Sequence, residues 1–361
     1  MTQPQTAAGK IRVLVVDDSA FVRRAIIRMF DSHPLISIID VASDGAMAIE
    51  LIKQHRPDVI TLDVQMPVLD GLAALERIMK ECPTPVVMLS SLTGKGGEQT
   101  LRALDLGAVD FIDKSSAGGP MEFNNLLQEL TSKILVAARI DLKKLTNSTA
   151  ARQVVLPVPS ATKASGTDVV LIGVSTGGPP ALQTIFTVIP ASFSVPILIV
   201  QHMPTGFTAS LAERLNRSCQ IEVREARDGE IALAGRAYIA PGGTHMKLSN
   251  TGKELQIRLD SKPDDTLHKP SVDVLFESAA RACGSKALAY VLTGMGKDGA
   301  VGATQIKNAG GRVVVESEET AVVFGMPKAV IDVIKVDGII PLHQIAENMI
   351  SMTSSRPRST S

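Results

Sequence analysis

Five polar residues in the first half of the chain have the types and positions that phosphoryl transfer requires. Each ends or closely follows a short apolar run: Asp17, Asp18, Asp63, Ser90 and Lys114. The carboxyl ends of parallel strands meet at one edge of a sheet, which is where open α/β sheets bind ligands. Carboxylates gathered there repel one another unless a hard cation joins them, and Mg²⁺ takes a few carboxylates while keeping several waters.

This set predicts a phosphoryl-acceptor pocket. Asp63 could attack a phosphoryl group as a carboxylate nucleophile. Lys114 and the Ser90 hydroxyl would then stabilise the charge on the transferred oxygens. Taken singly, each residue has a simpler interpretation as a helix cap, a polar turn or a solvated charge. Five of them at successive strand ends favour the pocket.

A serine in the second half lies in a turn that is typical of serine hydrolases. Residues 173–178 read GVSTGG, which puts Ser175 between a buried strand and a helix and satisfies the nucleophile-elbow pattern GxSxG. Glycines allow a tight turn, and amides at a helix N-terminus can face a developing oxyanion. The same turn could equally cradle a phosphate group, so the motif alone leaves both chemistries open.

A base and an acid at equivalent strand ends favour the hydrolase. His202 ends the strand VPILIVQ, and Asp298 follows the run ALAYVLTG within TGMGKDG. A serine hydroxyl needs a base to take its proton, and the base needs an acid to fix its tautomer. The chain order Ser, His, Asp differs from the order Ser, Asp, His of α/β-hydrolases, which predicts a triad on another fold.

Other residues could act as base or acid. His245 follows APGGT and His268 lies in a polar segment, so either could border the cleft without catalysing anything. His343 would restore the α/β-hydrolase order, but it opens the last amphipathic helix, where a solvated residue is the simpler interpretation. Asp273 is best explained as a charge at a helix N-terminus. We therefore favour His202 and Asp298.

Two alternating segments are expected to position these residues. Residues 10–140 show five alternations of β-branched runs with helical patterns, which predict a parallel sheet with helices on both faces. Residues 141–167 are rich in Ser, Thr, Ala, Lys and Pro and predict an interdomain linker. Residues 168–352 resume the alternation and predict a doubly wound, mostly parallel α/β domain, with AYIAP, HMKLS and LQIRLD as a small antiparallel insertion.

The composition is that of a globular protein. The 361 residues are 45% apolar and 20% charged, and Lys plus Arg equals Asp plus Glu at 37 each, so no general attraction to nucleic acid is expected. The three cysteines form no CxxC pair, which argues against a zinc site or a disulfide framework. The N-terminus is polar and no apolar run approaches the roughly 18 residues of a membrane span. We expect a cytoplasmic protein that does not insert into membranes.

Residues 10–130 resemble the response-regulator receiver family. The resemblance is carried by VLVVDDS, LDVQMPVLDG, VVMLSS and DFIDK. It implies a flavodoxin-like five-stranded parallel sheet in which Asp63 is phosphorylated by a histidine kinase and helps Asp17 and Asp18 to bind Mg²⁺. Ser90 and Lys114 would be the switch hydroxyl and the phosphate-binding lysine. Phe111 matches the aromatic switch position of that family.

Residues 168–350 resemble the catalytic domain of the CheB family of chemotaxis methylesterases. The motifs are IGVSTGGP, QHMP, APGGTHM, KPSVDVLFESAA, LTGMGKDGA, AGG and VVFGMPKAV. The resemblance implies that Ser175 is the nucleophile, His202 the base and Asp298 its acid, with backbone amides near Thr176 and Met295 as oxyanion donors. The family's QDE after AGG is replaced here by VESEE, which lies outside the triad.

The same resemblance implies what the enzyme acts on. The substrates would be γ-glutamyl methyl esters on methyl-accepting chemoreceptors, hydrolysed to methanol without a cofactor, and selected receptor glutamines, which would be deamidated. Competing classes are a non-enzymatic regulator that binds a ligand at the GVSTGG turn, a general esterase, and a DNA-binding regulator. The balanced charge and the lack of a recognisable helix-turn-helix count against the last of these.

Overall fold

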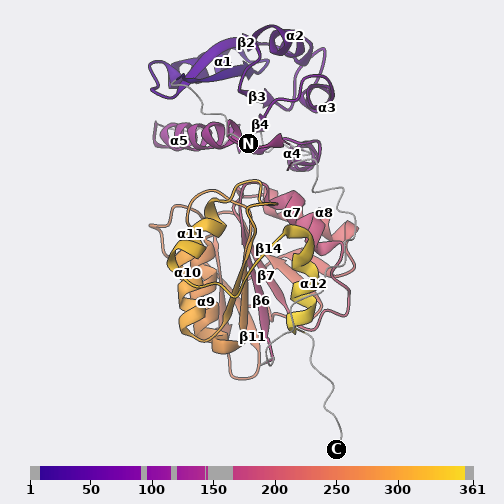
Figure 1. Cartoon of the computed structure of the whole chain (residues 1–361), viewed down its shortest axis with the longest axis vertical. Coiled ribbons are helices and arrows are strands. Elements are labelled where there is room, and N and C mark those ends of the chain that lie inside the picture. The colour runs from indigo at the N-terminus through magenta and orange to yellow at the C-terminus, as the bar shows by residue number, and fades with distance from the viewer. Residues whose placement is uncertain (1–8, 91–95, 115–119, 143, 145–165, 354–361) are drawn as a thin grey trace, which may run out of the picture. The chain divides into compact units, whose positions relative to one another are not determined.

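The chain divides into two compact units, Met1–Leu145 and Thr146–Ser361 (Figure 1). The computed structural model describes residues 9–90, 96–114, 120–142, 144 and 166–353. Most of the predicted linker, residues 141–167, lies outside the described residues. The exact domain bounds therefore stay a prediction.

The first unit alternates strands and helices as predicted. Its strands are β1 (Ile11–Val16), β2 (Ile36–Ala42), β3 (Val59–Asp63), β4 (Val86–Ser90) and β5 (Asp110–Asp113), and its helices are α1 (Ala20–Phe30), α2 (Gly45–His55), α3 (Gly71–Glu81), α4 (Gly96–Asp105) and α5 (Pro120–Ala137). All paired strands are parallel, in the order β2-β1-β3-β4-β5. The predicted five-stranded parallel sheet is confirmed.

Continuous apolar runs and helix caps explain this unit. Every residue of β3 and β4 is buried, as expected for strands that are covered on both faces. Side chains at the N-caps of three helices accept backbone N–H groups that would otherwise lack partners: Ser19, Asp44 and Asp70. The helices therefore begin just after the polar ends of the strands, and this leaves the carboxyl edge of the sheet for chemistry.

The second unit is built around a larger parallel sheet. Its strands are β6 (Val169–Val174), β7 (Ile197–Gln201), β8 (Glu222–Glu225), β9 (Arg236–Ile239), β10 (His245–Asn250), β11 (Leu255–Asp260), β12 (Ala287–Val291), β13 (Arg312–Glu316) and β14 (Gly338–Ile340). Its helices are α7 (Gly178–Phe186), α8 (Phe207–Ser218), α9 (Val272–Cys283), α10 (Ala300–Asn308), α11 (Gly325–Val333) and α12 (Leu342–Thr353), with a 3-10 turn at Gly284–Lys286. The main sheet has the order β14-β13-β12-β6-β7-β9-β8.

The structure confirms the mostly parallel α/β domain and corrects its details. The run AYIAP was predicted to belong to the antiparallel insertion, but its first three residues lie in β9, which pairs parallel with both β7 and β8. Only β10 and β11 pair antiparallel among the described strands. The short edge strand β14 was not predicted, because three residues are too few to show a strand pattern.

Close packing against β6 brings a helix to the site. A Cβ atom on Gly173 would lie 2.3 Å from a methyl carbon of Val272, the first residue of α9. Gly177 has φ 79° in the turn before α7, a conformation that glycine adopts readily. The glycines of the GVSTGG turn therefore allow both the approach of α9 and the turn itself.

Among the described residues, no helix has the length and apolar character needed to cross a bilayer.

Candidate active site and phosphoryl-acceptor pocket

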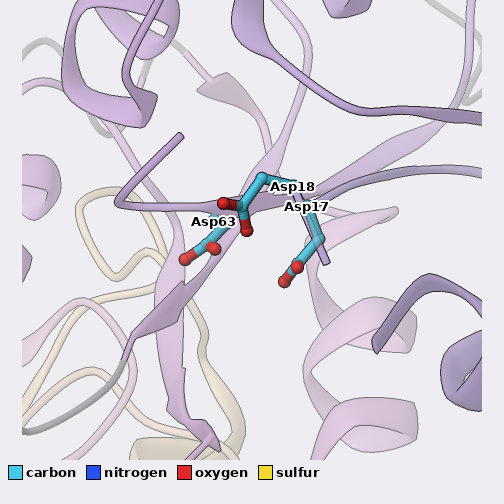
Figure 2. A group of neighbouring side chains, drawn as sticks. All are labelled: Asp17, Asp18 and Asp63. Carbon is cyan, nitrogen blue, oxygen red and sulfur yellow. The ribbon is translucent and has the colours of Figure 1, made fainter. Parts of the chain in front are cut away.

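Three carboxylates of the first unit meet at the carboxyl edge of its sheet (Figure 2). Asp17 and Asp18 follow β1 and Asp63 ends β3, and one oxygen from each lies within 4.8 Å of the others. Asp17 and Asp63 are buried, whereas Asp18 is exposed. An all-oxygen donor set of this kind, open on one side, fits a hard divalent cation that keeps part of its water shell.

Lys114 compensates part of this negative charge. Its Nζ lies 3.0 Å from Oδ2 of Asp17 and 2.8 Å from Oδ2 of Asp63. Burial acts to lower the pKa of Lys114, but its hydrogen bonds and attraction to Asp63 and Asp17 outweigh it and raise the pKa. Burial raises the pKa of Asp63 although Lys114 opposes the change. Lys114 therefore stays charged beside the carboxylate that was predicted to accept the phosphoryl group.

The two predicted switch residues lie on neighbouring strands. Ser90 ends β4, and its hydroxyl lies 2.6 Å from that of Thr100. Phe111 lies on β5 and is 3% exposed. The ammonium of Lys133 lies 5.4 Å from the centre of the Phe111 ring and donates a hydrogen bond to the Phe111 carbonyl. Lys133 was not predicted as part of the site, because nothing in a helical pattern marks which lysine is largely buried.

In the second unit, Ser175 and His202 follow neighbouring strands. Val174 of β6 pairs with Gln201 of β7, so the next residue on each strand reaches the same edge of the sheet. The Gln201 side-chain amide donates to the carbonyl oxygens of Ser175 at 3.0 Å and His202 at 3.2 Å. The Ser175 amide donates to the carbonyl of Thr293 at 3.0 Å, beyond the end of β12. Buried Gln201, which the sequence analysis missed, therefore joins the two segments.

His202 and Asp298 form a hydrogen-bonded pair. Nε2 of His202 lies 2.7 Å from Oδ2 of Asp298, and both side chains are largely buried. Nδ1 of His202 is buried and has no hydrogen-bond partner among the described residues. Because the Asp298 carboxylate accepts from Nε2, the proton of neutral His202 belongs there, and Nδ1 is the atom that can accept another proton.

Asp298 is held ionised by several donors. Its Oδ2 also accepts the Val272 amide at 2.7 Å, and its Oδ1 accepts the Ser271 hydroxyl at 2.8 Å and the Asp273 amide at 3.0 Å. Burial acts to raise the pKa of Asp298, but the bond to His202 and the backbone donors outweigh it and lower the pKa. The N-terminus of α9 therefore helps to keep the carboxylate charged beside the imidazole.

Asp273 does not contact His202 and instead binds the start of the next helix. It lies in the first turn of α9, as predicted, but its Oδ1 accepts the amides of Gly299 and Gly302 at the start of α10, at 2.9 and 2.7 Å. Burial, and then the neighbouring charge of Asp298, raises the pKa of Asp273 to about 6. Asp298 therefore caps the N-terminus of α9, and Asp273 caps the N-terminus of α10. Near neutral pH Asp298 is the more firmly ionised of the two.

The rival histidines fall at three different places. His245 opens β10 and is fully buried, so the expectation that it could border the cleft is wrong. His343 is exposed in the first turn of α12. His268 stacks on His202, the predicted base, with ring centres 4.1 Å apart and planes 22° apart. This contact was not predicted, because it joins two segments that sequence patterns do not relate.

The two predicted oxyanion segments adjoin each other. Thr176 follows Ser175 and is 7% exposed, and Met295 lies in the turn that follows β12. A Cβ atom on Gly294 would lie 2.8 Å from Cβ of Ser175, so the turn before Met295 passes directly beside the serine. This proximity is compatible with two amides facing one oxyanion, and their role stays a prediction.

The two units point to two classes of protein. A buried aspartate at a sheet edge with a paired lysine is typical of a receiver domain. A serine beside a His-Asp pair at the carboxyl ends of three parallel strands is typical of a serine hydrolase. Together they define a response regulator whose output is hydrolytic.

Comparison with known proteins identifies the family. The sequence matches the CheB methylesterase family over residues 170–349 and the response regulator receiver domain family over residues 13–153. It is 44% identical to the protein-glutamate methylesterase/protein-glutamine glutaminase of Pectobacterium atrosepticum over 96% of this chain and 98% of that one. The protein of the same name from Bordetella pertussis is 46% identical, with the same coverage of each chain. The chain belongs to the CheB methylesterase family.

A solved structure supports the same assignment. The catalytic domain of the Thermotoga maritima CheB methylesterase superposes with a TM-score of 0.51 at 44% identity, covering 52% of this chain and 100% of that one. The relation therefore extends from the sequence to the arrangement of the second unit.

Proposed function

We propose that this protein is a phosphorylation-controlled protein-glutamate methylesterase and protein-glutamine glutaminase of bacterial chemotaxis. The observation that carries the proposal is the buried His202-Asp298 pair beside Ser175 at one sheet edge, in a chain of the CheB methylesterase family. The substrates are glutamate methyl esters and selected glutamines on methyl-accepting chemoreceptors. Apart from water, ester hydrolysis needs only the groups of the protein itself.

The first half of the reaction forms an acyl-enzyme. Ser175 Oγ attacks the ester carbonyl carbon as its proton moves to Nδ1 of His202, and Nε2 keeps its proton on the bond to Asp298. The amides of Thr176 and Met295 stabilise the oxyanion, and the loss of one such donor typically costs about 10² to 10³ in rate. The bond to methoxide then breaks, and His202 returns its proton to release methanol.

The second half restores the enzyme. His202 takes a proton from water, which attacks the acyl carbon, and the Ser175 oxygen leaves with that proton. The product is a receptor glutamate. A glutamine follows the same path with ammonia as the leaving group, because His202 can protonate either leaving group at Nδ1.

The receiver controls this activity through Asp63. The three carboxylates of the pocket, Asp17, Asp18 and Asp63, would hold Mg²⁺, which supplies charge neutralisation for the transferred phosphoryl oxygens. A histidine kinase of the chemotaxis type supplies the phosphoryl group. Lys114 and Ser90 contact the phosphoryl oxygens on Asp63, and Phe111 responds to their movement. The receiver occupies residues 10–140 and the methylesterase domain residues 168–352, with the linker between them.

Mass spectrometry of receptor peptides tests the activity. Methylated receptors treated with wild-type protein are expected to lose the methyl group from esterified glutamates and to gain glutamate at selected glutamine positions. Ser175→Ala should do neither, because both reactions use the same nucleophile. Conversion that proceeds equally with Ser175→Ala would contradict the mechanism.

A further inference from the structure

The stack of two imidazoles is the feature of the site that the mechanism does not use. The ring of His268 lies face to face with that of His202, with centres 4.1 Å apart and planes 22° apart. His268 belongs to residues 263–271, which form most of the connection between β11 and α9. The hydrogen bond to Asp298 fixes only Nε2 of His202, and one hydrogen bond at one corner of a ring does not by itself set the plane of the ring.

Buried His245 fastens the segment that carries His268. Its Nε2 lies 3.0 Å from the carbonyl of Pro263 at the start of the segment, and its Nδ1 accepts the amide of Ser271 at the end, at 3.2 Å. The Gly243 amide also donates to the carbonyl of Lys269 at 3.0 Å. Burial lowers the pKa of His245, so its imidazole stays neutral and can donate at one nitrogen while accepting at the other.

The same segment reaches both the base and the acid. His268 covers one face of His202, and the Ser271 hydroxyl donates to Oδ1 of Asp298 at 2.8 Å. A segment that is fixed at both ends by one buried side chain therefore sets the ring plane of the base and the orientation of the acid together.

We propose that His268 is a positioning residue that clamps the imidazole of His202, so that the ring keeps the orientation in which Nδ1 can take the Ser175 proton. The inference rests on the proposed function. Clamping matters because proton transfer depends on alignment, and a displacement of about 1 Å can cost about 10²-fold in rate. A flat ring at position 268 is what the clamp requires, because the observed contact with His202 is a stack of ring faces.

Two substitutions separate stacking from other parts that His268 could play. His268→Phe keeps a flat ring that can stack, whereas His268→Leu fills similar space without a flat face. We expect the Leu variant to lose about 10- to 100-fold in kcat for methanol release with KM within about twofold of wild type. The Phe variant should keep kcat within about threefold. Substrate contact by His268 would instead raise KM and spare kcat, and that result would overturn the proposal.

Controls distinguish a failed clamp from a failed function. His343→Leu and His343→Phe make the same changes at an exposed histidine, and both should match wild type. A fluorophosphonate probe, which reacts with a base-activated serine and needs no receptor, provides a second readout, and the Leu variant should slow its reaction by the same factor. Absence of methanol release by wild type would contradict the proposed function, while the probe rates still test the clamp. Equal probe rates for wild type and His268→Leu would overturn the proposal that His268 clamps His202. Equal losses of kcat in the Leu and Phe variants would overturn it as well.

Discussion

Replacing Asp298 by asparagine tests the acid of the site, and the hydrogen bonds of Asp298 predict which way the new amide turns. If the NH₂ group of the asparagine took the place of Oδ2, it would face two other donors, the His202 ring N–H and the Val272 backbone N–H. On the Oδ1 side it meets the Ser271 hydroxyl, which can rotate to accept, and only the Asp273 amide loses its acceptor. The second orientation is therefore favoured. It keeps the tautomer of His202 and leaves one buried donor unsatisfied, at a cost of about 1–3 kcal/mol in the free energy of unfolding.

The loss of activity should then reflect the lost charge. A hydrogen bond to a neutral oxygen in place of a carboxylate stabilises the imidazolium less, by about 2–4 kcal/mol, which corresponds to about 30- to 1,000-fold in kcat. Reversal of the histidine tautomer would cost more, about 10⁴-fold in a serine protease triad.

Steady-state methanol release and urea unfolding measure the two effects. Asp273→Asn is the matched control, because the Gly299 and Gly302 amides both donate to Oδ1 of Asp273, an oxygen that asparagine retains. Its kcat should stay within about threefold of wild type. Activity of Asp298→Asn within threefold of wild type would refute the assignment of Asp298 as the acid. A loss near 10⁴-fold would refute the predicted orientation of the amide.

Three further results are expected. The pKa of Asp273 is raised from 3.8 to about 6 in the folded protein, so the stability that its protonation contributes is present below about pH 4 and is lost as the pH rises through 6. Urea unfolding of the wild type should therefore show the free energy of unfolding fall by about 1 kcal/mol over this range, a small change because the carboxyl group is partly exposed. Asp273→Asn should lack this fall. Lys133→Met should destabilise the receiver by about 2 kcal/mol, because Asp110 and the Phe111 carbonyl lose a largely buried cation. Lys80→Met at an exposed position is the control and should change the free energy of unfolding by less than about 0.5 kcal/mol. Equal effects of the two substitutions would contradict a stabilising role of the Lys133 contacts. Asp63→Asn should keep basal esterase activity and lose stimulation by a small-molecule phosphodonor, and stimulation that persists would place the phosphoryl group elsewhere.

Much of the fold could be predicted because buried parallel strands are continuous apolar runs with polar residues at their ends. The strands around Asp63, Ser175 and His202 all have this form. The run AYIAP was assigned to the wrong sheet, because the apolar pattern of a short strand does not show which other strand it pairs with. Pairing is decided by tertiary contacts with β7 and β8, and a pattern of apolar residues does not contain them.

The candidate site divides in the same way. Residues that follow strands, such as Ser175, His202 and Asp298, could be placed at one edge because strand ends share an edge. Their supports could not be placed. Gln201 and His268 act through contacts between segments, and a glutamine in a strand or a histidine in a polar segment has no distinctive spacing. The QHMP motif predicts a role for His202 but none for Gln201, the residue before it.

Ser175 is predicted to hydrolyse receptor methyl esters under the control of Asp63. Methanol release from methylated chemoreceptor membranes tests it most directly, measured for wild type, Ser175→Ala and Asp63→Asn, each with and without a small-molecule phosphodonor and Mg²⁺. We predict release by wild type that rises with the phosphodonor, unstimulated release by Asp63→Asn, and none by Ser175→Ala. Release by Ser175→Ala at the rate of wild type, or no release by wild type under either condition, would contradict the account.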